Sequence, residues 1–379
     1  MEKVRLCDVC DFQGGSQPPK NEWSFEQKDG YIRMLQIRDF TQTRNVEKEY
    51  IKLTSSTKTC VTEDILIARY GASIGKILTG LSGAYNVAIM KTIPNEGILN
   101  KSYLKYYLLS NYFQNGINSV GARAAQAGFN KEDLSKLYIP VVSLVQQKLI
   151  VDKLNKLTTF IGKRKTQLEK LDELVKSRFI EMFGNEIYPV TPLINLIKEG
   201  AGLSYGIVQP GNDGTGDMGI LRPVDMVDGK ISAASIKYIS RDIGDSFKKT
   251  ELTGDELLIT VRGTTGITAL TDGRFVGMNV TRGIAVIRYD RRKINPIYLK
   301  TYLNTDKSQR YIQEHTRGAT LQQINLSDLR IQEIPVPPMT RQEKMAAFVE
   351  QVDKSKFEIK QSLEKLELLK KALMQKYFG

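Results

Sequence analysis

Apolar residues recur at spacings of three and four between Ile150 and Met182. Two steps of this pattern are not apolar, and they fall on Arg164 and Arg178. Such a heptad pattern is typical of a long helix that packs one stripe against a second helix. The residues predicted to form this seam are Ile150, Leu154, Leu157, Ile161, Leu168, Leu171, Val175 and Met182.

The pattern occurs a second time, 195 positions further along the chain. Its polar steps fall on Lys356 and Lys370, and the two copies close with the same dipeptide, Phe183-Gly184 and Phe378-Gly379. Internal repetition of this kind indicates a tandem duplication in which each copy ends in a long helix. The second seam consists of Met345, Val349, Val352, Ile359, Leu363, Leu366, Leu373 and Tyr377.

Short apolar runs separated by turn residues precede each long helix, and they predict β-strands. In the first copy, Tyr31–Asp39 and Ala84–Lys91 each predict one strand. Leu137–Val142 predicts an edge strand or an exit segment, because Pro140 cannot donate to a central ladder.

Together these patterns predict an α+β protein built as a tandem duplication. Each copy contains a globular domain of mixed β-sheet with short helices, followed by a long helix. We expect the long helices to pair as an antiparallel coiled coil with pseudo-twofold symmetry, because each has one apolar stripe to bury. The predicted boundaries are 1–143 and 185–339 for the domains, and 144–184 and 340–379 for the helices.

Insertions between the copies concentrate in the loop-rich part ahead of each helix. The offset between matching residues drifts there, whereas it stays at 195 for later pairs such as Tyr103/Tyr298 and Gln147/Gln342. Variable loops on a scaffold of constant length are typical of a recognition module.

The composition is that of a globular protein with a basic surface. Hydrophobic residues make up 41% of the chain, the net charge is +13, and both copies share the positive excess. No apolar run approaches the roughly 20 residues of a membrane helix, and no signal-peptide pattern opens the chain, so we expect a cytoplasmic protein. The charge favours a polyanionic partner, with nucleic acid first, although a merely basic protein fits as well.

Candidate catalytic and metal-binding residues are few. Cys7 and Cys10 form a lone CxxC, and Cys60 and His315 are the other soft ligands, so we expect no metal site. Asp225, Asp228 and Lys230 imitate the carboxylate and lysine pattern of a metal-dependent nuclease. The Asp228-Gly229 pair, however, is a strong hairpin signal, and we expect no catalytic residue in the chain.

Basic and amide side chains recur in the predicted turns of both copies. Arginine can read guanine bidentately and glutamine can read adenine, while lysine positions phosphates. The alternative for each residue is a solvated or ion-paired surface side chain. The candidate DNA-binding residues are Gln17, Lys20, Arg33, Arg38, Arg69, Lys76, Arg123 and Gln126 in the first copy, and Gln209, Arg222, Arg262, Arg274, Arg282, Arg317 and Gln322 in the second.

In this order the motifs resemble the specificity (S) subunit of type I restriction–modification systems, over the whole chain. The resemblance is carried in the first copy by Gly14-Gly15-Ser16-Gln17-Pro18, by Asp64-Ile65-Leu66-Ile67, and by Ile139-Pro140-Val141 ahead of the helix. The second copy supplies Gly206-Ile207-Val208-Gln209-Pro210, Glu256-Leu257-Leu258-Ile259 and Ile334-Pro335-Val336-Pro337. One departure is Gln17-Pro18-Pro19, where many relatives have Thr-Pro-Ser.

The resemblance implies that the two globular domains are target-recognition domains, each reading one half of a bipartite double-stranded DNA sequence. It implies that the helices set the gap between the halves and dock two methyltransferase subunits, with restriction subunits as an optional addition. S-adenosylmethionine, ATP and Mg²⁺ would then belong to the partner subunits, and this chain would need no cofactor and no membrane. Two alternatives stay open: an inhibitor that binds methyltransferase subunits without reading DNA, and the nuclease.

Overall fold

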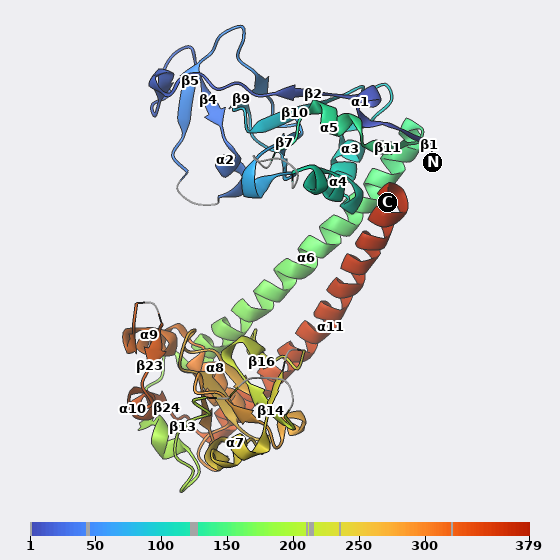
Figure 1. The fold of residues 1–379 in the computed structure, drawn as a ribbon. Helices are drawn as coiled ribbons and strands as arrows, with labels where there is room; N and C mark the ends of the chain where they lie inside the picture. The colour runs from blue at the N-terminus through green and yellow to red at the C-terminus, as the bar shows by residue number, and fades with distance from the viewer. Residues whose placement is uncertain are drawn as a thin grey trace. The chain divides into compact units, whose positions relative to one another are not determined.

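The computed structural model describes residues 2–42, 46–121, 128–209, 211, 216–234, 236–319 and 321–379. The chain forms two compact units, residues 1–165 with 360–379 (unit 1) and residues 166–359 (unit 2). The long helices α6 (Leu144–Phe183) and α11 (Met339–Phe378), green and red in Figure 1, each contribute one part to each unit. None of the described helices is long and apolar enough to cross a membrane.

Unit 1 combines short strands with short helices ahead of α6. Its elements in chain order are β1 (Glu2–Arg5), α1 (Leu6–Val9), β2 (Cys10–Gly14), η1 (Lys20–Glu22), β3 (Trp23–Ser24), β4 (Tyr31–Leu35), α2 (Ile37–Thr41), β5 (Glu49–Lys52), β6 (Thr59–Cys60), β7 (Leu66–Ala68), η2 (Gly71–Ser73), β8 (Ile77–Leu78), β9 (Gly83–Tyr85), β10 (Ile89–Pro94), α3 (Lys101–Leu108), α4 (Asn111–Gly121), α5 (Lys131–Ser135) and β11 (Tyr138–Val141).

Unit 2 begins its own series after α6. The elements are β12 (Val190–Pro192), η3 (Leu193–Leu196), β13 (Ser204–Tyr205), β14 (Met218–Leu221), η4 (Pro223–Asp225), β15 (Met226–Val227), β16 (Lys230–Ile231), β17 (Lys237–Ile239), α7 (Arg241–Asp245), η5 (Lys248–Thr250), β18 (Leu257–Thr260), β19 (Thr268–Leu270), η6 (Gly273–Phe275), β20 (Asn279–Val280), β21 (Ile284–Ile287), α8 (Pro296–Leu303), α9 (Asp306–Glu314), β22 (Thr316–Arg317), β23 (Gln323–Ile324), α10 (Leu326–Ile331) and β24 (Glu333–Pro335).

The sheets confirm the tandem duplication. The four-stranded sheet β2-β10-β7-β8 of unit 1 has the order and antiparallel pairing of β13-β21-β18-β19 in unit 2. A second sheet places β4 antiparallel to β5 and parallel to β9, as β14 pairs with β17 and β20. The antiparallel pair β1-β11 corresponds to β12-β24, and the predicted edge strand at Pro140 is β11. Among the described residues, the second copy has two hairpins without a counterpart in the first, β15-β16 and β22-β23. The first copy has β3 and β6, which extend its second sheet on either side and have no counterpart in the second copy.

Two of the predicted strands are interrupted. The Tyr31–Asp39 prediction is wrong beyond Leu35, because α2 begins at Ile37 behind a capping box formed by Gln36 and Asp39. The Ala84–Lys91 prediction is wrong in its middle, where β9 ends at Tyr85 and β10 begins at Ile89. Asn86 closes the intervening turn by accepting a hydrogen bond from the Ala88 amide.

The two long helices run antiparallel within each unit. In unit 1, Ile150 and Leu154 near the start of α6 share a core with Phe378 at the end of α11, and Lys165 lies 3.0 Å from Glu367 further along. In unit 2, Asp172 contacts Lys356 at 2.5 Å, and Met182 accepts a hydrogen bond from Arg341 at 2.8 Å.

The heptad positions are buried or half-buried in both helices, while most positions between them are exposed. The polar steps lie on the same stripe. Arg178 stacks its guanidinium over the Phe348 ring at 5.8 Å and pairs with Glu181 at 2.8 Å, whereas Lys356 pairs with Asp172. A narrow stripe closed by one partner helix leaves its residues half-exposed, which accounts for the intermediate burial along the middle of the seam.

Each long helix delivers its final phenylalanine to the core that the other copy's globular domain contributes. Phe378 ends the second copy and lies 5.0 Å from the Tyr103 ring in unit 1. Phe183 ends the first copy and lies 5.2 Å from the Tyr298 ring in unit 2. Both tyrosine hydroxyls donate to the carbonyl of the proline in the strand before the long helix, Pro140 at 2.9 Å and Pro335 at 3.0 Å.

A buried glutamine attaches the first turn of each long helix to its domain. Gln147 accepts from the Asn100 amide and Gln342 from the Asn295 amide, both at 2.8 Å. The two glutamines are 0% and 1% exposed, and their side-chain amides donate to backbone carbonyls. A buried amide is retained only where all its groups are paired, which accounts for a glutamine at the same place in both copies.

We expect the Phe378→Ala variant to lose about 3–5 kcal/mol of stability in unit 1, because a large aromatic side chain leaves a cavity there. Phe183→Ala should do the same in unit 2. Amide hydrogen exchange with mass-spectrometric readout separates the two effects, since each variant should lose protection in one unit. Phe357→Ala is the matched control, because Phe357 lies on α11 and is 56% exposed. Equal loss of protection in both units for either variant would contradict the reciprocal arrangement.

Candidate nucleic-acid interface

In unit 1 the chain after β2 passes directly against the turn between β9 and β10. The amide of Gly15 donates to Ile89 O at 3.0 Å, and that of Ser16 donates to Tyr85 O at 3.1 Å. A Cβ on Gly15 would lie 2.1 Å from the carbonyl oxygen of Asn86. Only glycine permits this approach, and it places the Gln17 loop beside the Asn86–Ala88 turn.

The end of β7 joins the same edge. The amide of Arg69 donates to Ala88 O at 2.8 Å, and its guanidinium donates to Phe129 O at 3.3 Å and lies 5.0 Å from the Tyr70 ring. Tyr70 in turn forms a β-bridge with Gly128. Lys76 closes the hairpin that follows, so it belongs to the same end of the sheet.

The corresponding edge of unit 2 has the same construction. A Cβ on Gly206 would lie 1.8 Å from Val280 O, and Ile207 donates to that carbonyl at 2.8 Å. The amide of Arg282 donates to Ile207 O at 2.9 Å. The loop that carries Gln209 therefore lies against the β20-β21 turn that carries Arg282.

The hairpin after β18 completes this second edge. Val261 donates to Gly283 O at 2.8 Å, which repeats the bond between Arg69 and Ala88 in unit 1. Arg262 forms a β-bridge with Gln323, and Gly263 donates to Gln322 O at 2.8 Å. In each unit, four segments that are distant in sequence therefore meet at the carboxyl end of one strand, β7 in unit 1 and β18 in unit 2. These segments are the loop after the first strand of the sheet, the hairpin after β7 or β18, the turn before the last strand, and the chain ahead of α5 or α10.

The candidate residues on these edges divide by their partners. Gln17, Lys20, Lys76, Gln209, Arg282 and Gln322 are exposed, and Arg69 and Arg262 are half-buried. Within the described part of the chain, the arginines and lysines of this group form no ion pair. We call these eight residues the unpaired set: Gln17, Lys20, Arg69, Lys76, Gln209, Arg262, Arg282 and Gln322.

Five candidate arginines contact carboxylates instead. Two of them are matched between the copies, since Arg33 pairs with Asp39 at 2.5 Å and Arg222 with Asp225 at 2.9 Å, and both aspartates also cap a helical turn. The hydrogen bond to Asp225 raises the pKa of Arg222. The other three pairs are Arg38 with Glu49, Arg274 with Asp272 and Arg317 with Asp328.

Arg274 lies at the opposite end of β18 from Arg262. Asp272, two residues before Arg274, lies close to Gly254: its carbonyl oxygen is 3.0 Å from where a Cβ on Gly254 would be. Gly254 itself lies just before the start of β18. Arg262 follows the opposite end of the same strand. Arg123 and Gln126 lie outside the residues that the structure describes.

Sequence reasoning missed Tyr70 and the Asn86–Ala88 turn. Tyr70 is 39% exposed beside Arg69, and a Cβ on Gly128 would lie 2.4 Å from its ring. Asn86 gave a signal that could have been used, because it interrupts an apolar run with a residue typical of turns. Its side-chain oxygen accepts from the Ala88 amide at 3.2 Å and so closes the turn.

The carboxylates of the nuclease alternative have structural roles. Asp225 is 0% exposed and bound by Arg222, while Asp228 has a φ of 51° and Gly229 a φ of 69° in the β15-β16 hairpin. Positive φ at both central residues is the geometry that an Asp-Gly hairpin turn requires. The carboxylate of Asp225 is thus occupied by its own arginine.

The three cysteines are free thiols. Burial raises the pKa of Cys10 to about 12 and that of Cys60 to about 11, so both stay protonated at neutral pH. A thiol must lose its proton to bind a metal ion. In the part of the chain that the structure describes, no group of three or more His, Cys, Asp or Glu side chains could hold a metal ion.

The chain contains two domains built on one plan. Each domain ends in a paired helix, and each has basic and amide side chains at one sheet edge. This architecture is that of a duplicated recognition protein. Residues 1–173 and 214–370 match the model of the type I restriction modification DNA specificity domain. This match covers most of the chain, and the chain belongs to that family. Its function is that of a specificity subunit, which is favoured over the inhibitor and the nuclease.

Individual relatives agree with this assignment. The chain is 22% identical over 408 residues to the specificity subunit of the Escherichia coli type I restriction enzyme EcoBI, an alignment covering 99% of this chain and 85% of that protein. It is 25% identical over 299 residues to the putative type I restriction enzyme MjaX specificity subunit of Methanocaldococcus jannaschii, covering 74% of this chain and 68% of that protein.

Solved structures share the fold. A chain from a study of complex assembly and conformational transition in the type I R-M system superposes with a TM-score of 0.60 at 18% identity, covering 100% of this chain and 97% of that one. The S subunit of a type I system from M. genitalium superposes with a TM-score of 0.55 at 14% identity, covering 100% and 96%. Both agree with the α+β duplication and its two long helices.

We expect the Gly206→Ala variant to be destabilised by about 1–3 kcal/mol, because the added methyl group would overlap the backbone oxygen of Val280. Gly15→Ala should behave in the same way in unit 1. Gly162→Ala on α6 is the control, since its Cβ position has no atom within 4 Å apart from the adjacent residues and the helix's own backbone, and alanine is the better helix former. Thermal unfolding of the three variants checks the order, and an unchanged melting temperature for Gly206→Ala would contradict the close approach.

Proposed function

We propose that each sheet edge reads one half of a bipartite DNA target. The observation that carries this proposal is the repetition of one edge in both units. The same four segments build it, two backbone hydrogen bonds and one β-bridge are matched between the units, and the side chains differ. A shared framework suits a shared task, docking against B-DNA. Different side chains suit the reading of two different half-sequences.

Within each edge we assign base reading to the arginines and glutamines of the unpaired set. A guanidinium with no carboxylate partner can present both donors to the O6 and N7 of guanine, and a glutamine can bind adenine in the same bidentate way. Arg262, Arg282, Gln209 and Gln322 provide these groups in unit 2. Gln17 and Arg69 provide them in unit 1, and Lys20 and Lys76 supply phosphate contacts there.

The paired arginines have a supporting role in this proposal. Arg33 and Arg222 are bound to the aspartates that cap the following helical turns. An arginine held in this way fixes a loop and would have to break a charge-assisted pair before it could bind a base.

The catalytic steps would belong to partner subunits. We propose that two methyltransferase subunits dock on the chain and bring S-adenosylmethionine, and that restriction subunits, where present, bring ATP- and Mg²⁺-dependent chemistry. This division is supported by the family and by relatives named as specificity subunits of restriction enzymes. The complex would act on double-stranded DNA in the cytoplasm.

We propose further that the long helices set the gap between the two half-sites. Each helix has 40 residues and runs without a break from the residues of one unit to those of the other. At 1.5 Å per residue each is about 60 Å long. Half-sites read from one face of B-DNA lie about 34–36 Å apart, a span that such helices can bridge.

In the first test, this chain and its methyltransferase subunit are expressed in a host that has no other DNA methyltransferase, and the methylated adenines in the host genome are mapped. We expect a two-part motif with a fixed gap. Arg262→Ala and Arg282→Ala should each weaken binding by about 1–3 kcal/mol and relax the sequence in one half only. Arg274→Ala is the control and should leave the motif intact, since Arg274 lies at the other end of β18. A change in both halves from one substitution would exclude the assignment of one half to each unit.

A second test lengthens the helices. Four residues inserted after Lys165 and four after Ile359 add about 6 Å to each helix, or roughly two base pairs. We expect the methylated motif to keep both halves and to gain a longer gap. Four residues inserted after Ser55, in an exposed turn, serve as the control for insertion itself. An unchanged gap with the lengthened helices would refute a spacing role.

A further inference from the structure

Tyr70 in unit 1 and Arg262 in unit 2 occupy equivalent backbone positions on the two sheet edges. Each lies two residues beyond the end of β7 or β18, and each forms a β-bridge with the chain ahead of α5 or α10. A glycine with positive φ follows in both cases, Gly71 at 69° and Gly263 at 86°. The bridge and the turn thus align a tyrosine in one unit with an arginine in the other.

Val87 and Arg282 form a second equivalent pair, in the turn before the last strand of each sheet. The carbonyl of the next residue, Ala88 or Gly283, accepts a hydrogen bond of 2.8 Å from the chain that leaves β7 or β18. Here unit 1 has a valine where unit 2 has an arginine.

At both positions unit 1 therefore displays apolar surface where unit 2 displays a guanidinium group. Tyr70 is 39% exposed and Val87 is 44% exposed. We call these two residues the apolar pair. Lys20 and Lys76 are exposed on the same edge, and their positive charge suits contact with DNA.

The ring of Tyr70 is held in place by its neighbours. The Arg69 guanidinium lies 5.0 Å from the ring, and a Cβ on Gly128 would lie 2.4 Å from a ring atom. The glycine makes room for the ring, whereas the bridge of unit 2 has Gln323 at this place. A side chain that is already fixed loses little conformational freedom on binding.

The backbone of Val87 is held to the same part of the edge. The Arg69 guanidinium donates to Val87 O at 3.4 Å and to Phe129 O at 3.3 Å. Arg69 thereby joins the turn that carries Val87 to the chain that packs under Tyr70. The side chain of Val87 remains exposed while its backbone is fixed.

The two kinds of side chain are complementary to different bases. In the major groove, guanine presents the O6 and N7 acceptors that a guanidinium binds, and thymine presents a C5-methyl group. An isopropyl group has no hydrogen-bonding atom, so the methyl group of thymine is the feature of a base edge that it complements. Contact between the two removes apolar surface of both from water.

We propose that the apolar pair reads thymine through its C5-methyl group, at the positions of the unit 1 half-site that correspond to the guanines read by Arg262 and Arg282 in the other half. This inference rests on the proposed function and adds the type of base to it. Tyr70 and Val87 are then specificity-determining residues, and Tyr70 acts through its ring, not its hydroxyl group.

The test uses the full chain in complex with its methyltransferase subunit and duplex oligonucleotides that carry the mapped target. The unit 1 half is the one that Arg262→Ala leaves unchanged. Deoxyuridine replaces each thymine of this half in turn, which removes the methyl group and keeps the base pairing. We expect the wild-type complex to lose about fourfold in affinity at one or two of these thymines, the effect of one buried methyl group.

Variants of the apolar pair should remove this preference. We expect Val87→Ala and Tyr70→Ala each to bind thymine and deoxyuridine equally at the position that the substituted residue reads. Tyr70→Phe should keep the preference, because it keeps the ring. All three should retain the melting temperature of the wild-type chain, since both side chains are exposed.

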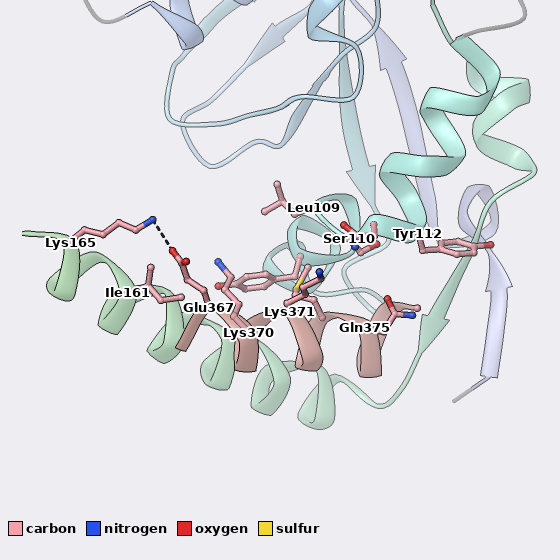
Figure 2. A pocket seen from close by; sticks show the side chains of 13 residues that line it. Leu109, Ser110, Tyr112, Ile161, Lys165, Glu367, Lys370, Lys371 and Gln375 are labelled. Atoms are coloured by element: carbon pink, nitrogen blue, oxygen red, sulfur yellow. Dashed lines mark ion pairs between the residues drawn. The ribbon is translucent and has the colours of Figure 1, made fainter. Parts of the chain in front are cut away.

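Two exposed apolar residues of unit 1 away from the edge serve as controls. Val61 lies ahead of β7, whereas Tyr70 follows that strand, and Val61 is 55% exposed. Leu109 is 46% exposed and borders the pocket beside α11 (Figure 2). Val61→Ala and Leu109→Ala should both keep the preference for thymine.

Three results would overturn the inference: a unit 1 half without thymine on either strand, equal binding of thymine and deoxyuridine by the wild-type complex at every position, or an unchanged preference in both alanine variants. A Tyr70→Phe complex that loses affinity equally for both duplexes would show a backbone contact through the hydroxyl group and would overturn the assignment of Tyr70. A host genome with no two-part motif would refute the proposed function itself.

Discussion

The contact between a helix-ending phenylalanine and a tyrosine of the opposite copy holds each unit together. Tyr103 lies at the centre of unit 1, where it donates to Pro140 O and receives the Phe378 ring. Tyr298 does the same in unit 2 with Pro335 and Phe183. Neither core is therefore complete with residues of its own copy alone. This reciprocal exchange requires the antiparallel course of α6 and α11, because each helix must end in the core where the other begins.

The exchange separates what must stay constant from what can vary. The elements around each tyrosine, including the buried glutamines at the starts of α6 and α11, keep the offset of 195 between copies. The segments at the sheet edges differ in length and side chains, and in the second copy they include the β22-β23 hairpin. A recognition surface can thus change its loops while the same tyrosine, proline and glutamine contacts support it.

The long helices and the duplication were predictable because both depend on periodicity. A seam repeated at a fixed offset is visible in one sequence, and α6 and α11 begin within one residue of the predicted positions. The breaks after Leu35 and Tyr85 were not visible, because a capping box at Gln36 and an asparagine turn at Asn86 overrode apolar runs that favour strands. Local hydrogen bonds of this kind compete with strand pairing without changing the hydrophobic pattern.

The candidate interface was predictable in composition but not in detail. Basic and amide residues in turns suggested nucleic acid, yet the sequence does not show that Arg222 is bound by Asp225 or that Arg274 lies at the other end of β18. Pairing of this kind depends on which side chains face one another after folding.

The exchange of helix ends also reverses the order in which the two units can be finished during synthesis. Unit 2 consists of one continuous stretch, residues 166–359, whereas unit 1 needs residues 360–379, the last part of the chain described here. The ribosome releases the N-terminal part first. The hydrophobic core around Tyr103 cannot be completed until Phe378 has been synthesised, because Phe378 belongs to that core. The part of the protein that is made first is thus the last to close.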